Sequence, residues 1–275
     1  MSDPEKYIGR LAPSPTGLLH IGHAATFWTA YECARQHGGT LLLRNEDLDP
    51  QRSKQEFAEA MIEDLAWLGI AWTPPIVVQS ERLGIYRLAF ERLLAGGFVY
   101  PCTCSRRELA LMVAAPHEDT DDEPVYSGRC RPTGCGARVF ETGLNYRFRV
   151  PDGETVRFDD GNMGTQSYRA GADFGDFLVW RKDGLPSYQL ACVVDDAAMH
   201  VTEAVRGADL LKSTARQILL QHALELPATT YFHTRLLRDE HGIRLAKRHD
   251  ALAIRTLRKR GVTREAVLAM CDAQD

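Results

Sequence analysis

The first 44 residues carry two short apolar runs on either side of a helical pattern, and this order limits the possible folds more than any other feature. Tyr7 to Ala12 predicts a short strand, which the turn residues PSPTG at 13 to 17 end. From Ile21 to about Gln36 the apolar residues recur at helical spacing, and Gly38-Gly39 can supply a left-handed cap. Leu41 to Arg44 then predicts a second, buried strand. A strand, helix and strand in this order form a βαβ unit, which predicts a parallel sheet with its ligand at the carboxyl ends of the strands.

The alternation of helices and strands continues along the chain, with one interruption. Between Tyr100 and about Arg169 the sequence is rich in Gly, Pro and Cys and includes the acidic stretch HEDTDDE, which indicates an inserted subdomain. Further helices are predicted at Ser53 to Leu68, Ile85 to Ala95 and Leu210 to Leu224, and further strands at Tyr146 to Val150, Glu154 to Phe158, Phe177 to Arg181 and His200 to Arg206. We expect one half of an α/β domain at residues 1–99, the insert at 100–172, the second half at 173–235, and a loop with a short helical extension at 236–275.

The composition excludes several classes of protein. With 44% hydrophobic and 25% charged residues the chain is an ordinary globular one, and a disordered chain is excluded. No apolar run approaches the roughly 20 residues that cross a bilayer, and the start MSDPEKYIGR lacks the layout of a signal peptide. We therefore expect a cytoplasmic protein with no membrane partner. In that reducing compartment the seven cysteines are better candidates for metal ligands than for disulfides.

The net charge of −4 hides a local excess of positive charge. Residues 235–265 hold ten Lys/Arg and four Asp/Glu, a local +6 that leaves −10 for the rest of the chain. Because phosphate contacts dominate the affinity of proteins for nucleic acids, this segment is compatible with an RNA partner. A basic helix that only faces solvent is the alternative.

The first chemical motif is His20-Ile21-Gly22-His23, at the expected junction of loop and helix. The start of a helix offers unpaired backbone N–H groups and a partial positive charge, so it attracts phosphate. Two imidazoles one turn apart can donate to the same phosphate oxygens during displacement at an α-phosphorus. Gly22 leaves no side chain where an adenine would lie close to the backbone. A histidine-rich helix start without catalytic meaning is the alternative.

The run GRLAPSPTGLLHIGH as a whole resembles the first signature of the class I aminoacyl-tRNA synthetases, specifically their glutamyl branch, and RGADLL and LAKRHD fall where that branch requires them. The second class I signature, KMSKS, corresponds here to residues 244–248, with Lys247 in the place of the lysine that neutralises pyrophosphate. The third position is Ala246 instead of serine, so one hydroxyl contact to ATP is absent. Such a hydrogen bond typically contributes about 1 kcal/mol to the free energy of binding. The resemblance implies a Rossmann-type α/β fold with a parallel sheet, an inserted acceptor-end-like subdomain that binds zinc, and a short helical C-terminal extension.

The resemblance also assigns the site residues. ATP, carried with Mg2+, would be bound by His20, Gly22, His23 and Lys247, and the catalytic residues would be His20, His23 and Lys247. Glutamate would be bound by Arg10, Leu11, Ala12, Pro13, Ser14, Glu46, Tyr188 and Arg206. Arginine suits the two carboxylates because its guanidinium pairs with them in a bidentate manner, and Glu46 would meet the ammonium. Taken singly, each of these arginines is as easily a partner in an ordinary salt bridge.

The insert contains a candidate zinc site. Cys102, Cys104, Tyr126 and Cys130 match the ligand pattern of the small glutamyl-like proteins, which use tyrosine as the fourth ligand. Three thiolates and one oxygen satisfy tetrahedral zinc, and such a Zn2+ would be structural. Two features depart from the pattern: the acidic stretch adds length between the two halves, and Cys135 offers a competing thiolate. Reduced cysteines without metal are the alternative.

The length of the chain points to one subfamily. A complete glutamyl-tRNA synthetase continues into a helical region that reads the anticodon, whereas this sequence stops soon after its second signature, at Asp275. It therefore resembles the glutamyl-queuosine tRNA(Asp) synthetases, which activate L-glutamate with ATP and esterify it to the queuosine base in the anticodon stem-loop of tRNA(Asp). We expect a monomeric ligase of this kind. The alternatives are a truncated glutamyl-tRNA synthetase that charges the 3′ end, a catalytically silent paralogue that binds tRNA or glutamate, and a small-molecule nucleotidyltransferase.

Overall fold

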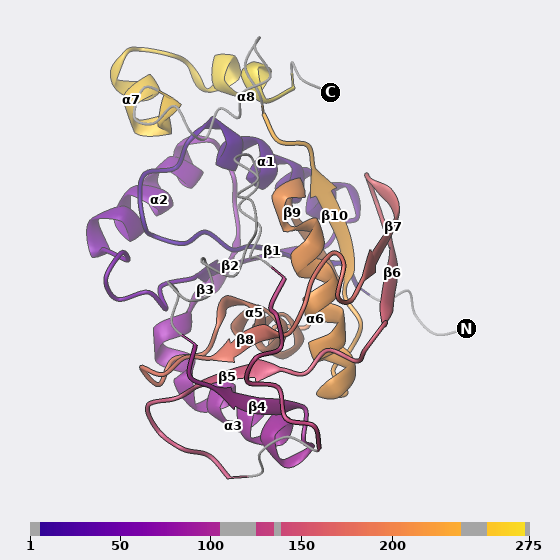
Figure 1. The fold of residues 1–275 in the computed structure, drawn as a ribbon. Helices are drawn as coiled ribbons and strands as arrows, with labels where there is room; N and C mark the ends of the chain where they lie inside the picture. The colour runs from indigo at the N-terminus through magenta and orange to yellow at the C-terminus, as the bar shows by residue number, and fades with distance from the viewer. Residues whose placement is uncertain (1–5, 105–124, 135–138, 238–251, 273–275) are drawn as a thin grey trace. The chain divides into compact units, whose positions relative to one another are not determined.

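The computed structural model describes residues 6–104, 125–134, 139–237 and 252–272 (Figure 1). The chain divides into two compact units, each with its own strands and helices. The first unit comprises Met1–Glu81, His200–Ala208 and Thr229–Asp275, and the second comprises Arg82–Met199 and Asp209–Ala228. The division into four segments that the sequence suggested stays a prediction.

The first unit is built on a layer of parallel strands. These are β1 (Ile8–Leu11), β2 (Thr40–Asn45), β3 (Thr73–Val78), β9 (Glu203–Gly207) and β10 (Thr230–Thr234). The pairs β1–β2, β2–β3 and β9–β10 are all parallel. The Tyr7 carbonyl accepts the N–H of Thr40, whereas the next carbonyl, that of Ile8, accepts the N–H of Thr202 just before β9. Since successive carbonyls of a strand point to opposite edges, β2 and β9 flank β1, and the order is β3-β2-β1-β9-β10.

This order places a topological switch point at β1. The chain leaves β1 through a helix to β2 on one side, and β9 and β10 extend the layer on the other. In open α/β sheets, ligands bind outside the carboxyl ends of the strands where the order reverses. The predicted parallel sheet is therefore confirmed, and the carboxyl ends of β1 and β9 are where a ligand is expected.

Helices of the first unit close around this layer. They are α1 (Ile21–Gln36), α2 (Gln55–Trp67), α7 (Ile254–Lys259) and α8 (Arg264–Asp272). Helix α1 packs against β1, β2, β9 and α8, and α2 packs against α7. The predicted bounds of α1 are confirmed, and so is its cap, because Gly38 has φ +57° and Gly39 donates to the Ala34 carbonyl at 2.8 Å. Fully buried Leu11, Leu43 and Leu65 lie in the core of this unit.

In its described residues, the second unit combines antiparallel strands with helices. Its sheet has the order β4-β5-β8, with β4 (Val99–Cys102), β5 (Asn145–Phe148) and β8 (Phe177–Trp180). A hairpin pairs β6 (Thr155–Asp160) with β7 (Gly164–Arg169). The helices are α3 (Leu83–Ala95), α5 (Tyr188–Ala198) and α6 (Leu211–Ala223), and α5 packs against both others and β8. Phe90 stacks on Trp180 at 4.9 Å between ring centroids and meets Tyr146 edge-on, which joins α3 to the sheet.

Most predicted helices and strands are confirmed to within a few residues. The strand predicted at His200 to Arg206 begins only at Glu203, because His200 has φ 54° and therefore turns the chain. Strand β3 was not predicted, because it contains Pro74-Pro75 and proline is rare in central strands. It lies at the edge of the layer, where proline is tolerated. In the part of the chain that the structure describes, no helix combines the length and the apolarity needed to span a bilayer.

Candidate functional site

The two histidines of the motif His20-Ile21-Gly22-His23, called the HIGH motif after its one-letter code, form the cap of α1. The N–H of Gly22 donates to Nδ1 of His20 at 3.1 Å, and the N–H of His20 donates to Nδ1 of His23 at 3.2 Å. This is a capping box in which imidazoles replace the usual Ser and Glu, and the two rings stack with centroids 3.7 Å apart. Because each Nδ1 accepts a backbone N–H, the proton of each neutral ring lies on Nε2. Both histidines can therefore act as donors at the amino end of α1, where anions are attracted.

Gly22 lies close to the imidazole ring that caps α1. A Cβ at this position would lie 3.0 Å from Cε1 of His20 and 3.1 Å from its Nδ1, closer than side chains normally pack. The His20 ring therefore occupies the space that a side chain at residue 22 would need. The close approach of an adenine to Gly22 stays a prediction beside this structural reason.

The loop between β1 and α1 is anchored at both ends. Near its start, the N–H of Glu46 donates to the Pro13 carbonyl at 3.0 Å, which joins the ends of β1 and β2. Near its end, the N–H of Ile254 donates to the Leu19 carbonyl at 2.8 Å. Ser14 is exposed between these anchors. The loop that carries the predicted glutamate contacts Ala12 to Ser14 is therefore fixed against the sheet.

Two buried arginines lie on neighbouring strands at the switch point. Arg10 on β1 donates from Nη1 to the Val205 carbonyl of β9 at 2.8 Å. Arg206, the next residue of β9, donates from Nε to Nε2 of His233 at 3.1 Å, and its guanidinium lies over the Tyr231 ring at 5.0 Å. Each arginine is 4% exposed. Both buried cations therefore lie near the carboxyl ends of adjacent strands, where the fold is expected to bind its ligand, and their role in binding an anion stays a prediction.

Glu46 is held by an arginine that the sequence pattern did not single out. It follows β2, is buried, and accepts hydrogen bonds at Oε1 from Nη2 of Arg44 at 2.9 Å and from its Nε at 3.2 Å. Arg44 is fully buried, so its charge needs the carboxylate. The pair fixes the orientation of the Glu46 carboxylate, and its predicted contact with an ammonium group stays a prediction.

The remaining predicted residues lie in the second unit or outside the described residues. Tyr188 belongs to the second unit, where it is the first residue of α5 and is 40% exposed. Ser187 caps this helix by accepting the N–H of Leu190 at 3.3 Å. Lys247 and Ala246 lie outside the described residues, as does the competing thiolate of Cys135. The other predicted residues all belong to the first unit: Arg10, Leu11, Ala12, Pro13, Ser14, His20, Gly22, His23, Glu46 and Arg206.

Paired carboxylates elsewhere in the chain have structural partners. Asp195 is fully buried in the second unit and accepts from Nε of Arg82 at 2.8 Å and from the Tyr86 hydroxyl at 2.7 Å. Asp47 accepts from both the N–H and the hydroxyl of Ser80, at 2.8 and 2.6 Å.

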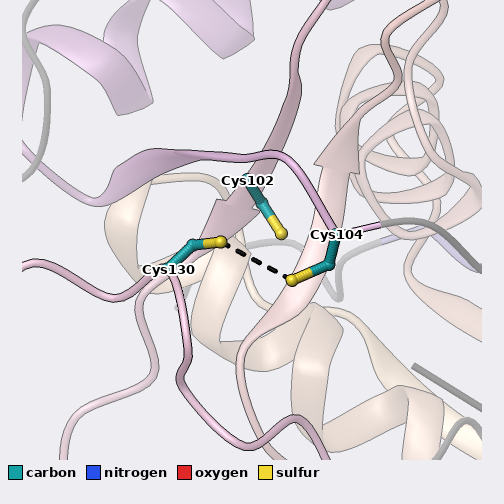
Figure 2. Close-up of side chains that lie close together, drawn as sticks. All are labelled: Cys102, Cys104 and Cys130. Carbon is teal, nitrogen blue, oxygen red and sulfur yellow. Dashed lines mark hydrogen bonds between the residues drawn. The ribbon is translucent and has the colours of Figure 1, made fainter. Parts of the chain in front are cut away.

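Three cysteines of the second unit gather at the end of β4 (Figure 2). The Sγ atoms of Cys102, Cys104 and Cys130 all lie within 4.8 Å of one another, and those of Cys104 and Cys130 are 3.6 Å apart. The hydroxyl of Tyr126 lies 3.6 Å from Sγ of Cys102 and 3.6 Å from Sγ of Cys104. The four predicted ligands therefore come together as one cluster.

The spacing of this cluster fits a tetrahedral metal. Ligands at the roughly 2.0 Å (oxygen) and 2.3 Å (sulfur) typical of zinc are separated by about 3.5 to 3.8 Å at the corners of a tetrahedron. The 3.6 Å separations have this size. In addition, the N–H of Cys130 donates to the Tyr126 oxygen at 2.9 Å, which orients this oxygen toward the sulfur atoms and would stabilise it as a metal ligand. The residues present therefore fit Zn2+.

The thiols of the cluster differ in acidity. Burial raises the pKa of Cys104 and that of Tyr126. Burial opposes ionisation of Cys130 too, but hydrogen bonds from Tyr126, the Thr103 backbone and Cys104 outweigh it and lower the pKa of Cys130 to about 6. Since the lowered pKa belongs to the folded state, the Cys130 thiolate stabilises the fold at neutral pH, and this contribution is lost as the pH falls through about 6.

In metal-free protein, we expect Cys130 to be alkylated by iodoacetamide with a midpoint near pH 6, because only the thiolate reacts. Cys33 is the internal comparison, since it is also partly exposed but burial raises its pKa. Its reaction should need pH above about 8.5, the ordinary thiol value. The measurement is the pH profile of each labelled peptide by mass spectrometry. Coincident profiles would contradict the assignment.

Two residues of the site were not found from the sequence, Arg44 and His233. Each is a polar residue inside a short buried strand, in LLLRN and in TYFHT. A charged or imidazole side chain in such a strand needs a buried hydrogen-bond partner. A polar residue within an apolar run was therefore the sequence feature that could have pointed to both residues. The partner of His233 lies 27 residues away, so the sequence alone could not name it.

Comparisons with known proteins agree with this geometry. Residues 7–273 match the family model described as tRNA synthetases class I (E and Q), catalytic domain. The chain is 46% identical over 266 residues to a glutamyl-Q tRNA(Asp) synthetase of Nitratidesulfovibrio vulgaris, covering 92% of this chain and 82% of that protein. It is 45% identical over 272 residues to a protein of the same name from Symbiobacterium thermophilum, and the match covers 94% of this chain and 84% of that protein.

A solved structure gives the same fold. The crystal structure of a glutamate tRNA ligase from Elizabethkingia meningosepticum, in complex with its amino acid, matches with a TM-score of 0.75 at 30% identity. The match covers 89% of this chain and 52% of that one, so the chain spans about half the length of this solved relative. The sequence resemblance to the glutamyl branch is thereby confirmed.

Proposed function

Because the chain belongs to the class I tRNA synthetases of the E and Q type, a family of ligase-type enzymes that use ATP, we propose that it activates L-glutamate as glutamyl-adenylate and transfers it to the queuosine base in the anticodon of tRNA(Asp). The proposal of glutamate is supported by two buried arginines on neighbouring strands, Arg10 and Arg206, and by the carboxylate of Glu46 at the end of β2, which Arg44 holds in place. The proposal of queuosine is supported by the names of relatives that are 45 and 46% identical over most of their length.

The arrangement accounts for the first step. A carboxylate oxygen of glutamate attacks the α-phosphorus of ATP, whose Mg2+ accompanies it, and the bond to pyrophosphate breaks. In this proposal the Nε2 protons of His20 and His23 meet the phosphate oxygens at the amino end of α1, where charge builds up. Lys247, outside the described residues, would neutralise the departing pyrophosphate.

The same first unit would hold the amino acid. Arg10 and Arg206 would bind its carboxylates, and Glu46 would bind its ammonium. In the second step a hydroxyl of the acceptor attacks the activated carbonyl carbon, and AMP leaves. This step needs mainly the correct placement of the two reactants, since the adenylate is already activated. The contact of Tyr188 with glutamate that the sequence resemblance implied stays a prediction.

The cysteine cluster is proposed to hold one structural Zn2+. Cys102, Cys104, Cys130 and Tyr126 would occupy all four positions of its tetrahedron. A filled coordination shell leaves no place for a substrate, so the metal would stabilise the segment after β4 and take no part in the reaction.

One experiment separates the acceptors. ATP–pyrophosphate exchange with glutamate, measured without RNA, tests adenylate formation; we expect exchange. Transfer of labelled glutamate to tRNA(Asp) with and without queuosine then tests the acceptor, and only the queuosine-containing tRNA should accept it. Charging of queuosine-free tRNA would favour a truncated glutamyl-tRNA synthetase, and no exchange with or without RNA would favour a silent paralogue.

His233 is predicted to orient Arg206 for glutamate. His233→Leu removes the acceptor for Nε of Arg206, so we expect KM for glutamate in the exchange assay to rise about 10-fold, the equivalent of one hydrogen bond to a charged group. KM for ATP should change by less than about 2-fold, because His233 would act on ATP only indirectly.

The conservative variant is the control. In His233→Gln the amide oxygen lies close to the place of Nε2 and can still accept from Arg206, so KM for glutamate should return toward the wild-type value. Equal KM values for the Leu and Gln variants, with both proteins folded, would show that His233 only fills space.

A further inference from the structure

A cavity of roughly 700 Å³ opens on the first unit along α2, α7 and α8. Its charged lining consists of Arg255, Arg258, Lys259, Arg264 and Glu63, and Trp67 supplies an aromatic wall. None of these residues belongs to the site proposed for glutamate and ATP. The cavity is therefore a separate, strongly basic hollow.

The local sequence makes this hollow. Ile254 and Leu257 of α7 are buried, so the cations at 255, 258 and 259 lie on the other side of the helix. Gly261, with φ +78°, ends α7, and the N–H of Val262 donates to the Leu257 carbonyl at 3.1 Å. This turn leads directly into α8, which begins with Arg264 at the same cavity.

The arginines are held in place by the surrounding residues. Arg258 donates from Nη1 to buried Asp64 at 2.8 Å, and its guanidinium lies over the Trp67 ring at 5.3 Å. Arg255 pairs with Glu63, whose side chain is 61% exposed. Cations that are ordered before a ligand arrives lose less entropy when they bind it.

The charge of the cavity stays positive after these pairs are counted. Four cations line it, and two of them have carboxylate partners, Glu63 and Asp64. Lys259, which is exposed, and Arg264 remain as the excess, and Arg260 adds a further exposed cation beside them. On a chain with a formal charge of −4, such a concentration of cations favours a polyanion as the occupant.

We propose that this cavity binds the sugar-phosphate backbone of the RNA acceptor. The inference rests on the proposed function, in which the acceptor is a tRNA. Arginine forks and an exposed lysine match phosphodiester oxygens, and an acidic partner protein is the alternative that the experiment would expose. The cavity is also linked to the nucleotide site: Ala253 bridges to His20, and Ile254 donates to the Leu19 carbonyl at 2.8 Å. RNA at α7 would therefore contact the same unit that carries the HIGH motif.

Charge reversal at Lys259 tests the proposal. In Lys259→Glu we expect the Kd for queuosine-containing tRNA(Asp) to rise about 10-fold near 0.1 M salt, and the slope of log K against log salt to become shallower by about 1 to 2. Glu63→Gln removes the carboxylate from the lining of the cavity, so the Kd of this variant for the same tRNA should fall about 2- to 3-fold. Two changes of opposite sign are hard to obtain from unfolding.

Lys6→Glu is the matched control, because Lys6 is an exposed lysine of the same unit outside the cavity. Pyrophosphate exchange without RNA should be unchanged in all three variants. If Lys259→Glu binds tRNA as Lys6→Glu does while both exchange normally, the cavity is not the RNA site. Absence of exchange in the wild-type protein would instead defeat the proposed function.

Discussion

His23→Gln should slow ATP–pyrophosphate exchange with glutamate by about 10²- to 10³-fold, the effect of removing one preorganised donor from a developing charge. Glutamine is the ordinary residue at this position of a capping box, so its amide oxygen can still accept the N–H of His20. The variant therefore keeps the cap and loses the Nε2 donor. The unfolding free energy should change by less than about 1 kcal/mol, the usual range of a helix cap.

His20→Asn separates the capping role from the donor role at the first histidine of the motif. Asparagine is among the best N-cap residues, so the hydrogen bond from Gly22 can be kept while the second donor is lost. His37→Gln is the control, because His37 caps the other end of α1 and is exposed. Exchange rates in His23→Gln and His20→Asn that equal the rate in His37→Gln would reduce the HIGH motif to a helix cap.

The part of the site that was predictable from the sequence is the part encoded locally. The strand, loop and helix from Tyr7 to Gln36 follow one another without a gap, and the cap at His20 uses residues two and three positions away. Hydrophobic spacing and turn residues are sufficient signals at this range. The amino-acid sequence alone therefore places the motif at the amino end of a helix.

The buried polar pairs were not predictable in the same way. Arg10 meets the carbonyl of Val205, 195 residues away, and Arg206 meets His233. These contacts depend on β9 lying beside β1, an order that hydrophobic patterning does not determine. The sequence suggested which residues carry the charge, whereas their supporting partners required the register of the strands.

The cysteine cluster illustrates an intermediate case. The C-x-C at 102–104 has a spacing that suggests metal ligands, but the third and fourth ligands come from a separate segment. Tyr126 was implied only by resemblance, because tyrosine is a common core residue and rarely a zinc ligand. Its hydroxyl 3.6 Å from two sulfurs and 2.9 Å from the Cys130 N–H supplies the physical reason that spacing could not.

Replacement of one zinc thiolate should have the largest effect on stability. In Cys104→Ser we expect the bound zinc to fall from about one per chain to near zero, because serine is a poor zinc ligand. Loss of a structural metal should lower the stability of the second unit by about 3 to 5 kcal/mol, which corresponds to a fall in Tm on the order of 10 °C. Elemental analysis and thermal unfolding with and without a chelator are the measurements.

Two further variants decide whether the four residues act as one site. Tyr126→Phe keeps the ring, over which the Arg147 guanidinium lies at 4.1 Å, and removes only the oxygen, so zinc should bind more weakly but still bind through the three thiolates. Cys33→Ser, which changes a cysteine of the first unit outside the cluster, should keep both the zinc and the Tm. Wild-type protein that contains no zinc and is unaffected by chelation would leave the cluster as three reduced cysteines. A metal content that falls equally in Cys33→Ser and Cys104→Ser would show that the zinc is bound elsewhere.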